Sequence, residues 1–92
     1  MALVTVTISG ASRGATLAWN ANPRPLGGTG GGNFGTSFQE RSGPAIYAIV
    51  VFGNPADPWT AKVTDGNHSQ NHSGHMSPGG FDTTGDTPFT VS

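Results

Sequence analysis

Three histidines in one short segment are the residues of this sequence whose types and spacing first suggest chemistry. His68, His72 and His75 lie in GNHSQNHSGHMS, four and three residues apart. On a helix this spacing would place three imidazoles on one face, an arrangement that suits zinc or copper. The segment is rich in Gly, Ser and Asn, which favour turns, so the competing interpretation is a solvated surface loop. A metal-binding module using these histidines, with Asp65 as a fourth ligand, is therefore an alternative function.

A second group of residues favours recognition of a neutral, hydroxyl-rich ligand. Sugar sites combine an aromatic face for the C–H patch of the ring with polar groups that bond its hydroxyls. In this interpretation Trp59 stacks on the sugar, Asp65 and Asn67 bond its hydroxyl groups, and histidines close the rim. The competing interpretation makes Trp59 and Trp19 core residues. The expected ligand-binding residues are Trp59, Asp65, Asn67, His68, Asn71 and His72, and the site needs no metal or cofactor.

Other motifs carry less chemistry. Gly30-x-Gly32-x-x-Gly35 has the letters of a dinucleotide fingerprint, but no strand precedes it and no helix follows it. The aspartates in residues 65–67 and 82–86 resemble pieces of calcium loops without the alternating ligands of an EF-hand, and turn chemistry explains them. No nucleophile has an evident base and orienting acid, and a chain of 92 residues has little room for a deep pocket. We therefore expect no catalytic residues and no enzyme.

The charge content excludes several classes of partner. Lys and Arg number 4 and Asp and Glu number 5, so only 10% of the residues are charged, against roughly 25% in an average domain. Four cations cannot neutralise many phosphates, which argues against nucleic acid. The longest apolar run, residues 45–52, has eight residues, and crossing a bilayer takes about 20. The N-terminus lacks the cationic start of a signal peptide, so the expected location is cytoplasmic.

Short strands must position these residues, because no segment shows sustained helical periodicity. Residues 2–9 alternate apolar and polar side chains, which indicates a half-buried strand, and the turn at 10–14 predicts a hairpin with 15–20. Residues 21–32 and 65–86 are expected to be mostly loop. The sequence predicts an all-β fold, a small antiparallel β-sandwich or compact barrel of about six short strands, in a single domain over 1–92. The six strands are 2–9, 15–20, 34–41, 45–52, 59–64 and 87–92.

The strand at 45–52 is apolar on both faces, so both faces must be covered. The chain has no cysteine and 15 glycines, which leaves a thin core without disulfides to support it. Burial of the second face against another copy would add stability. We therefore expect a homo-oligomer, a dimer or larger, which would also combine weak single sites into useful avidity.

In size, composition and strand pattern the chain resembles the small, cysteine-poor, all-β cytosolic lectins of fungi and bacteria. The resemblance implies an oligomeric β-sandwich that binds glycans without catalysis, and it transfers no individual residues. A carbohydrate-binding protein for neutral glycans is thus the expected function. Two alternatives are the metal-binding module with His68, His72 and His75, and a structural or toxin-like protein-interaction module in which residues 45–52 pack on a partner chain.

Overall fold

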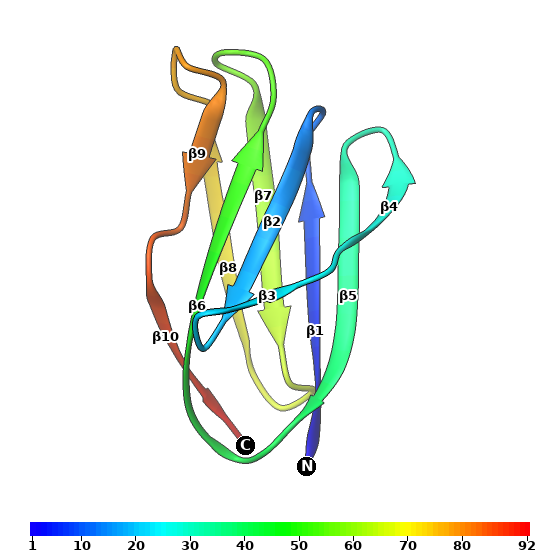
Figure 1. Cartoon of the computed structure of the whole chain (residues 1–92), viewed down its shortest axis with the longest axis vertical. Coiled ribbons are helices and arrows are strands. Elements are labelled where there is room, and N and C mark those ends of the chain that lie inside the picture. The colour runs from blue at the N-terminus through cyan, green and yellow to red at the C-terminus, as the bar shows by residue number, and fades with distance from the viewer.

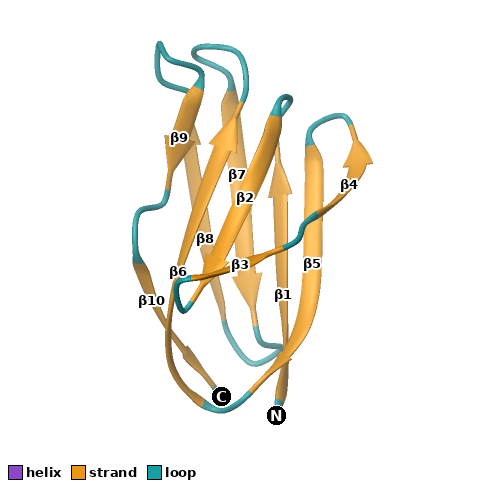
Figure 2. Cartoon of the chain, viewed as in Figure 1, coloured by secondary structure: helices purple, strands orange, loops and turns teal.

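The strands of the computed structural model, which describes all 92 residues, form two antiparallel sheets that pack face to face (Figure 1). Sheet A has the order β4-β5-β1-β7-β8, and sheet B has the order β10-β6-β2-β3, with β9 also paired to β6. The all-β sandwich is confirmed, without a helix (Figure 2), but it has ten strands rather than six. The strands are β1 (Ala2–Ser9), β2 (Gly14–Trp19), β3 (Asn22–Arg24), β4 (Gly27–Gly30), β5 (Asn33–Glu40), β6 (Gly43–Phe52), β7 (Pro58–Thr64), β8 (Ser69–His75), β9 (Phe81–Thr83) and β10 (Thr87–Val91).

The core lies between the sheets and takes every second residue of the long strands, because successive side chains of a strand point to opposite faces. Sheet A contributes the alternating apolar residues of β1 and β7, and sheet B contributes those of β2, β6 and β10. Aromatic rings gather at one end: Trp19 stacks on Tyr47 with ring centroids 5.9 Å apart and meets Phe89 edge-on. The buried apolar residues on these strands are Val4, Val6, Ile8, Leu17, Trp19, Ala45, Tyr47, Ile49, Val51, Trp59, Ala61, Val63, Phe89 and Val91.

The predicted hairpin between residues 2–9 and 15–20 is wrong. β1 pairs with β5 and β7, whereas β2 pairs with β3 and β6, so the two strands belong to opposite sheets. Each strand has one apolar face, and opposite sheets let these faces meet across the core. Gly10 begins the crossing with φ of 90°, in a place where a side chain would collide with the carbonyl of Pro58. Only glycine fits both conditions.

The two segments expected to be mostly loop contain four of the strands. β3 and β4 lie within 21–32, and the chain between them passes from sheet B to sheet A (Figure 1). β8 and β9 lie within 65–86. The side chains of β8 that face inward are Gln70 and His72, so this strand lacks the apolar alternation by which a strand is recognised.

β6 is central in its sheet, with β2 on one side and β9 and β10 on the other. Its inner face is buried, but the chain does not cover its outer face. There Ile46 is 52% exposed and Phe52 38% exposed. No helix in the structure has the length and apolar character to cross a membrane.

Candidate functional site

Trp59 lies in the core. It is 3% exposed, and its indole Nε1 donates a hydrogen bond of 2.8 Å to Oδ2 of Asp82. A buried ring has no face to offer a ligand, so the structure gives no support to stacking of a sugar on Trp59. Trp19 is placed in the same way, 1% exposed with its Nε1 2.8 Å from Oε2 of Glu40. The alternative interpretation of both tryptophans as core residues is the one that matches the structure.

Asp65 is a buried carboxylate that organises the turn between β7 and β8 and ties it to the C-terminus. It accepts hydrogen bonds from the backbone N–H groups of Ser92 (2.8 Å), Asn67 (2.9 Å) and His68 (3.0 Å). These bonds, the one from Ser92 above all, hold the pKa of Asp65 well below its usual range, although burial acts in the other direction. Both carboxylate oxygens already have partners within the chain, which is the property of a structural group.

The three histidines do not come together. The ring of His68 stacks on Phe89 at 4.8 Å, and its Nδ1 is 3.3 Å from Oδ1 of Asp65. His72 faces inward from β8, whereas His75, three residues further along the same strand, faces outward. No group of three or more His, Cys, Asp or Glu side chains in the structure is close enough to hold a metal ion.

Tyr47 and His72 form a polar cluster that links the two sheets along the edge where β8 meets β10. The hydroxyl of Tyr47 lies 2.6 Å from Nε2 of His72 and donates a bond of 2.7 Å to Oε1 of Gln70. The amide of Gln70 then donates to the carbonyl of Pro88 at 3.0 Å. Burial raises the pKa of Tyr47 to about 12 and lowers the pKa of His72. The sequence does not reveal this cluster, because its members are 23 to 25 positions apart.

The outer face of sheet A carries polar, mostly uncharged side chains in register. Thr7 pairs with Lys62, and Lys62 pairs in turn with Asn71. One row along, Ser9 pairs with Thr60, and Thr60 pairs with Ser73 on the next strand. Paired residues point to the same side of a sheet, so these groups form a grid across β1, β7 and β8.

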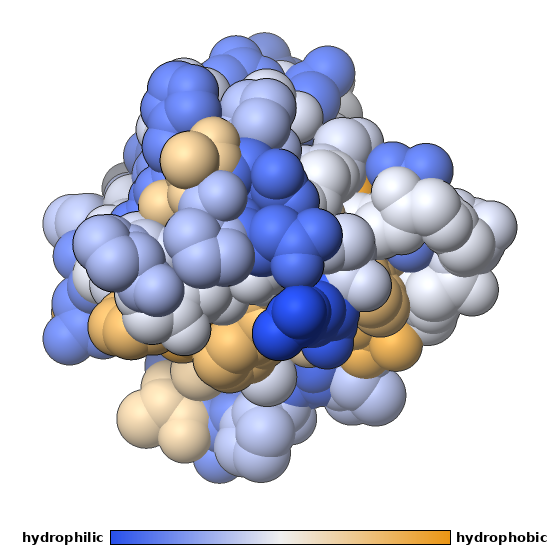
Figure 3. Space-filling view, turned by 90° about the horizontal axis from the view of Figure 1, so that it is seen from above, coloured by the Kyte–Doolittle hydropathy of each residue, from blue (hydrophilic) through white to orange (hydrophobic).

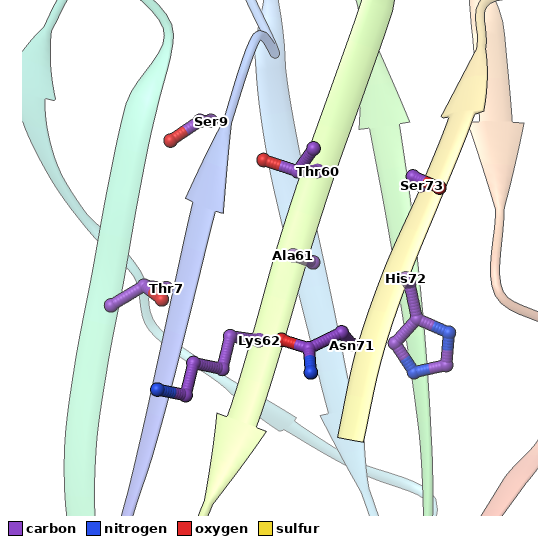
Figure 4. A pocket seen from close by; sticks show the side chains of 8 residues that line it. All are labelled: Thr7, Ser9, Thr60, Ala61, Lys62, Asn71, His72 and Ser73. Carbon is purple, nitrogen blue, oxygen red and sulfur yellow. The ribbon is translucent and has the colours of Figure 1, made fainter. Parts of the chain in front are cut away.

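A hollow of about 270 Å³ lies within this grid (Figure 4). In the close view Lys62 extends over β1, Asn71 points from β8 toward β7, and the imidazole of His72 turns away from the other side chains. Ala61 is the one apolar residue among those that line it. The lining residues are Thr7, Ser9, Thr60, Ala61, Lys62, Asn71, His72 and Ser73.

Two of the six residues expected to bind ligand, Asn71 and His72, line this hollow. Asp65, Asn67 and His68 instead lie in the turn at the end of β7, near the C-terminus (Figure 1). The other polar lining residues were missed, although the alternation of residues 2–9 and 59–64 already places Thr7, Ser9 and Thr60 on the solvent side. What identifies them as one group is the pairing of β1 with β7, which the sequence does not show.

The lining of the hollow supplies groups for hydrogen bonding. Hydroxyl groups both donate and accept, the amide of Asn71 does the same, and Lys62 only donates. No carboxylate lines the hollow.

The chain matches no protein-family model, no curated protein and no solved structure. Geometry alone therefore defines its class, an antiparallel β-sandwich with one polar and one apolar outer face.

Proposed function

We propose that the protein binds neutral carbohydrate on the outer face of sheet A, without a catalytic step, and that it acts as an oligomer. The observation that supports this function is the lining of the hollow. Four hydroxyl side chains, one amide, one ammonium group and one imidazole line it, with a single apolar residue. The site thus differs from the expected one, with which it shares Asn71 and His72.

The same lining favours a ligand with many hydroxyls and little charge. Each Ser or Thr hydroxyl can donate to one sugar oxygen and accept from another. A polyanion would find one cation, Lys62, and a polycation would find no carboxylate. The hollow lacks an aromatic platform, so its affinity for a single sugar rests on hydrogen bonds that compete with water. Weak single sites gain most from several copies acting together.

The two alternative functions fare differently. A metal-binding module would need His68, His72 and His75 to converge, and they face three different surroundings. A protein-interaction module has one observation in its favour, the open apolar face of β6.

A glycan array with the purified protein, run with EDTA and again with added zinc and calcium, tests the proposed function. We expect binding to a related set of neutral glycans in both runs, because no step needs a metal. Asn71→Ala and Thr60→Val should each weaken this binding about tenfold, the effect of one or two lost hydrogen bonds.

Matched controls exist elsewhere on the surface. Asn67→Ala, in the turn after β7, is the control for Asn71→Ala. Thr90→Val, on β10 in the other sheet, is the control for Thr60→Val. Both control positions are exposed. These two variants should bind like the wild type. Folded protein that binds no glycan would overturn the proposed function. Loss in Asn67→Ala with none in Asn71→Ala would move the site back to the turn.

A further inference from the structure

The outer face of sheet B is apolar, in contrast to that of sheet A. Three of the five large hydrophobic side chains that the molecule exposes lie on it: Ile46 (52%), Phe81 (49%) and Phe52 (38%). They share the face because Phe52 pairs with Phe81 and because Ile46 is an even number of residues from Phe52. In the end-on view, apolar residues form a band just below the middle of the molecule, which strongly hydrophilic atoms interrupt and hydrophilic residues flank on both sides (Figure 3). The apolar face, as we name it, comprises Ile46, Ala48, Val50, Phe52, Phe81 and Pro88.

The broad side of the molecule that carries the apolar face has the area that one partner contributes to a standard dimer interface. Soluble monomers rarely expose a continuous apolar patch of this kind without a use for it. The molecule measures 38 × 24 × 21 Å, and the sheets stack along the shortest axis (Figure 1). Each broad side of a 38 by 24 Å outline offers on the order of 900 Å², and a standard interface buries about 800 Å² per partner.

Two opposite charges lie at separate margins of the apolar face. Asp86 lines a groove of about 280 Å³ together with Ile46 and Ala48. Arg13 lies past the other end of β6, where its backbone N–H donates to the carbonyl of Phe52 at 2.9 Å. Both residues are exposed. Along β6, the position next to Asp86 and the position next to Arg13 are about five residues apart, which is roughly 17 Å.

This arrangement is complementary to itself. An isologous interface places the same patch of both subunits in contact, so that whatever one residue meets on the partner is met in return. A two-fold axis that lies in the interface and crosses β6 near Val50 brings Arg13 of each copy toward Asp86 of the other. Two ion pairs then flank the buried apolar side chains, and no like charges lie against each other.

We propose that the apolar face is the interface of a two-fold symmetric dimer, with Arg13 of one copy paired to Asp86 of the other. The dimer covers the second face of β6. It also leaves the two A sheets on opposite outer sides, pointing away from each other. If carbohydrate binds to sheet A, as proposed above, one dimer bridges two separate glycans and does not bind one surface twice.

Sedimentation velocity over a wide range of concentrations tests the interface, with a matched pair of variants. Ile46→Lys places a charge on the apolar face, and Leu3→Lys makes a comparable change on the outer side of β1, where Leu3 is 50% exposed. The wild type and Leu3→Lys should sediment at twice the 9.3 kDa of the chain. Ile46→Lys should sediment as a monomer with an unchanged circular dichroism spectrum. A monomeric wild type at every concentration, or equal behaviour of the two variants, would overturn the interface.

A charge exchange tests the symmetry of the dimer. Arg13→Asp and Asp86→Arg each bring like charges together and should raise the dissociation constant about tenfold or more. The variant with both changes restores opposite charges and should recover the wild-type constant. Failure to recover would show that these residues do not meet, and the two-fold pairing would be rejected.

The outcomes for the dimer and for sugar binding are separable. Ile46→Lys should still bind a glycan array but should no longer precipitate a polyvalent glycan, because a monomer has one site. A dimer that binds no glycan would leave the interface standing and overturn the proposed function. A folded monomer that binds glycans would do the reverse, and the apolar face would then belong to a different protein partner.

Discussion

The two outer faces of the sandwich follow the same rule of alternation and yet have opposite character. On sheet A the outward positions of β1 and β7 are mostly Thr, Ser and Lys, whereas on sheet B those of β6 are Ile, Ala, Val and Phe. The inward positions of these three strands are apolar alike. The core therefore accounts for the inward residues. The difference between the outer faces is what we expect if one face meets water and the proposed ligand and the other meets the apolar face of a second copy.

Removing the contrast between the faces should have the largest effect. A variant with Thr60→Ile and Lys62→Ile would give sheet A an apolar outer face as well, with residues that suit a strand. Each molecule would then have two adhesive faces on opposite sides, and association would no longer close at the dimer. Dynamic light scattering should show particles that keep growing with concentration.

The same two positions provide the control for that experiment. Thr60→Ser with Lys62→Gln keeps the face polar and should leave the particle size unchanged. An isoleucine variant no larger than the wild type would show that apolar character alone does not make a face adhesive, and would weaken the interpretation of sheet B.

Neighbouring residues on β7 sharpen the contrast between inside and outside. Trp59→Ala removes a buried ring and leaves Asp82 without its indole partner, so the free energy of unfolding should fall by about 3–5 kcal/mol. Thr60→Val, one residue further and exposed, should change it by less than about 0.5 kcal/mol. Urea denaturation of both variants measures the two values. A small loss for Trp59→Ala together with weakened glycan binding would restore Trp59 as a ligand-binding residue.

How far the sequence predicts this fold depends on where the apolar residues are. The six strands expected from alternation or from a continuous apolar run are all present within about two residues, because their inward positions hold Val, Ile, Phe or Trp. β8 was missed because its inward side chains are Gln70 and His72, which pack as a hydrogen-bonded cluster with Tyr47. A polar pair can occupy the interior only when each group finds a partner, and that partner lies in another sheet.

The candidate site was harder to predict than the fold, for a related reason. Trp59 and Asp65 have the residue types of a sugar site, but their polar atoms are occupied by partners distant in sequence, Asp82 and Ser92. The ring of His68 faces a local partner, the carboxylate of Asp65 three residues before it. The residue type shows which hydrogen bonds a side chain can make. Only the fold shows whether a partner within the chain already takes them. The hollow on sheet A arises from the pairing of β1 with β7, strands about 55 residues apart, which local patterns do not contain.

The smallest effect we predict concerns the cluster that joins the two sheets. Burial lowers the pKa of His72 below the value of about 6.5 in the unfolded chain. Above that pH neither state binds the proton, and the full stability is present. As the pH falls below 6.5 the unfolded chain takes up the proton first, so the free energy of unfolding decreases. The melting temperature should therefore fall between about pH 7 and pH 5.

His72→Gln isolates this contribution, because an amide can bond the hydroxyl of Tyr47 and does not titrate. Its melting temperature should change less over the same interval than that of the wild type. Asp65 does not confuse the comparison, since both proteins contain it and its unfolded carboxylate takes up a proton mainly as the pH falls through about 3.8, below the interval compared. Parallel curves for wild type and variant would show that the bond between Tyr47 and His72 does not couple the sheets to protonation.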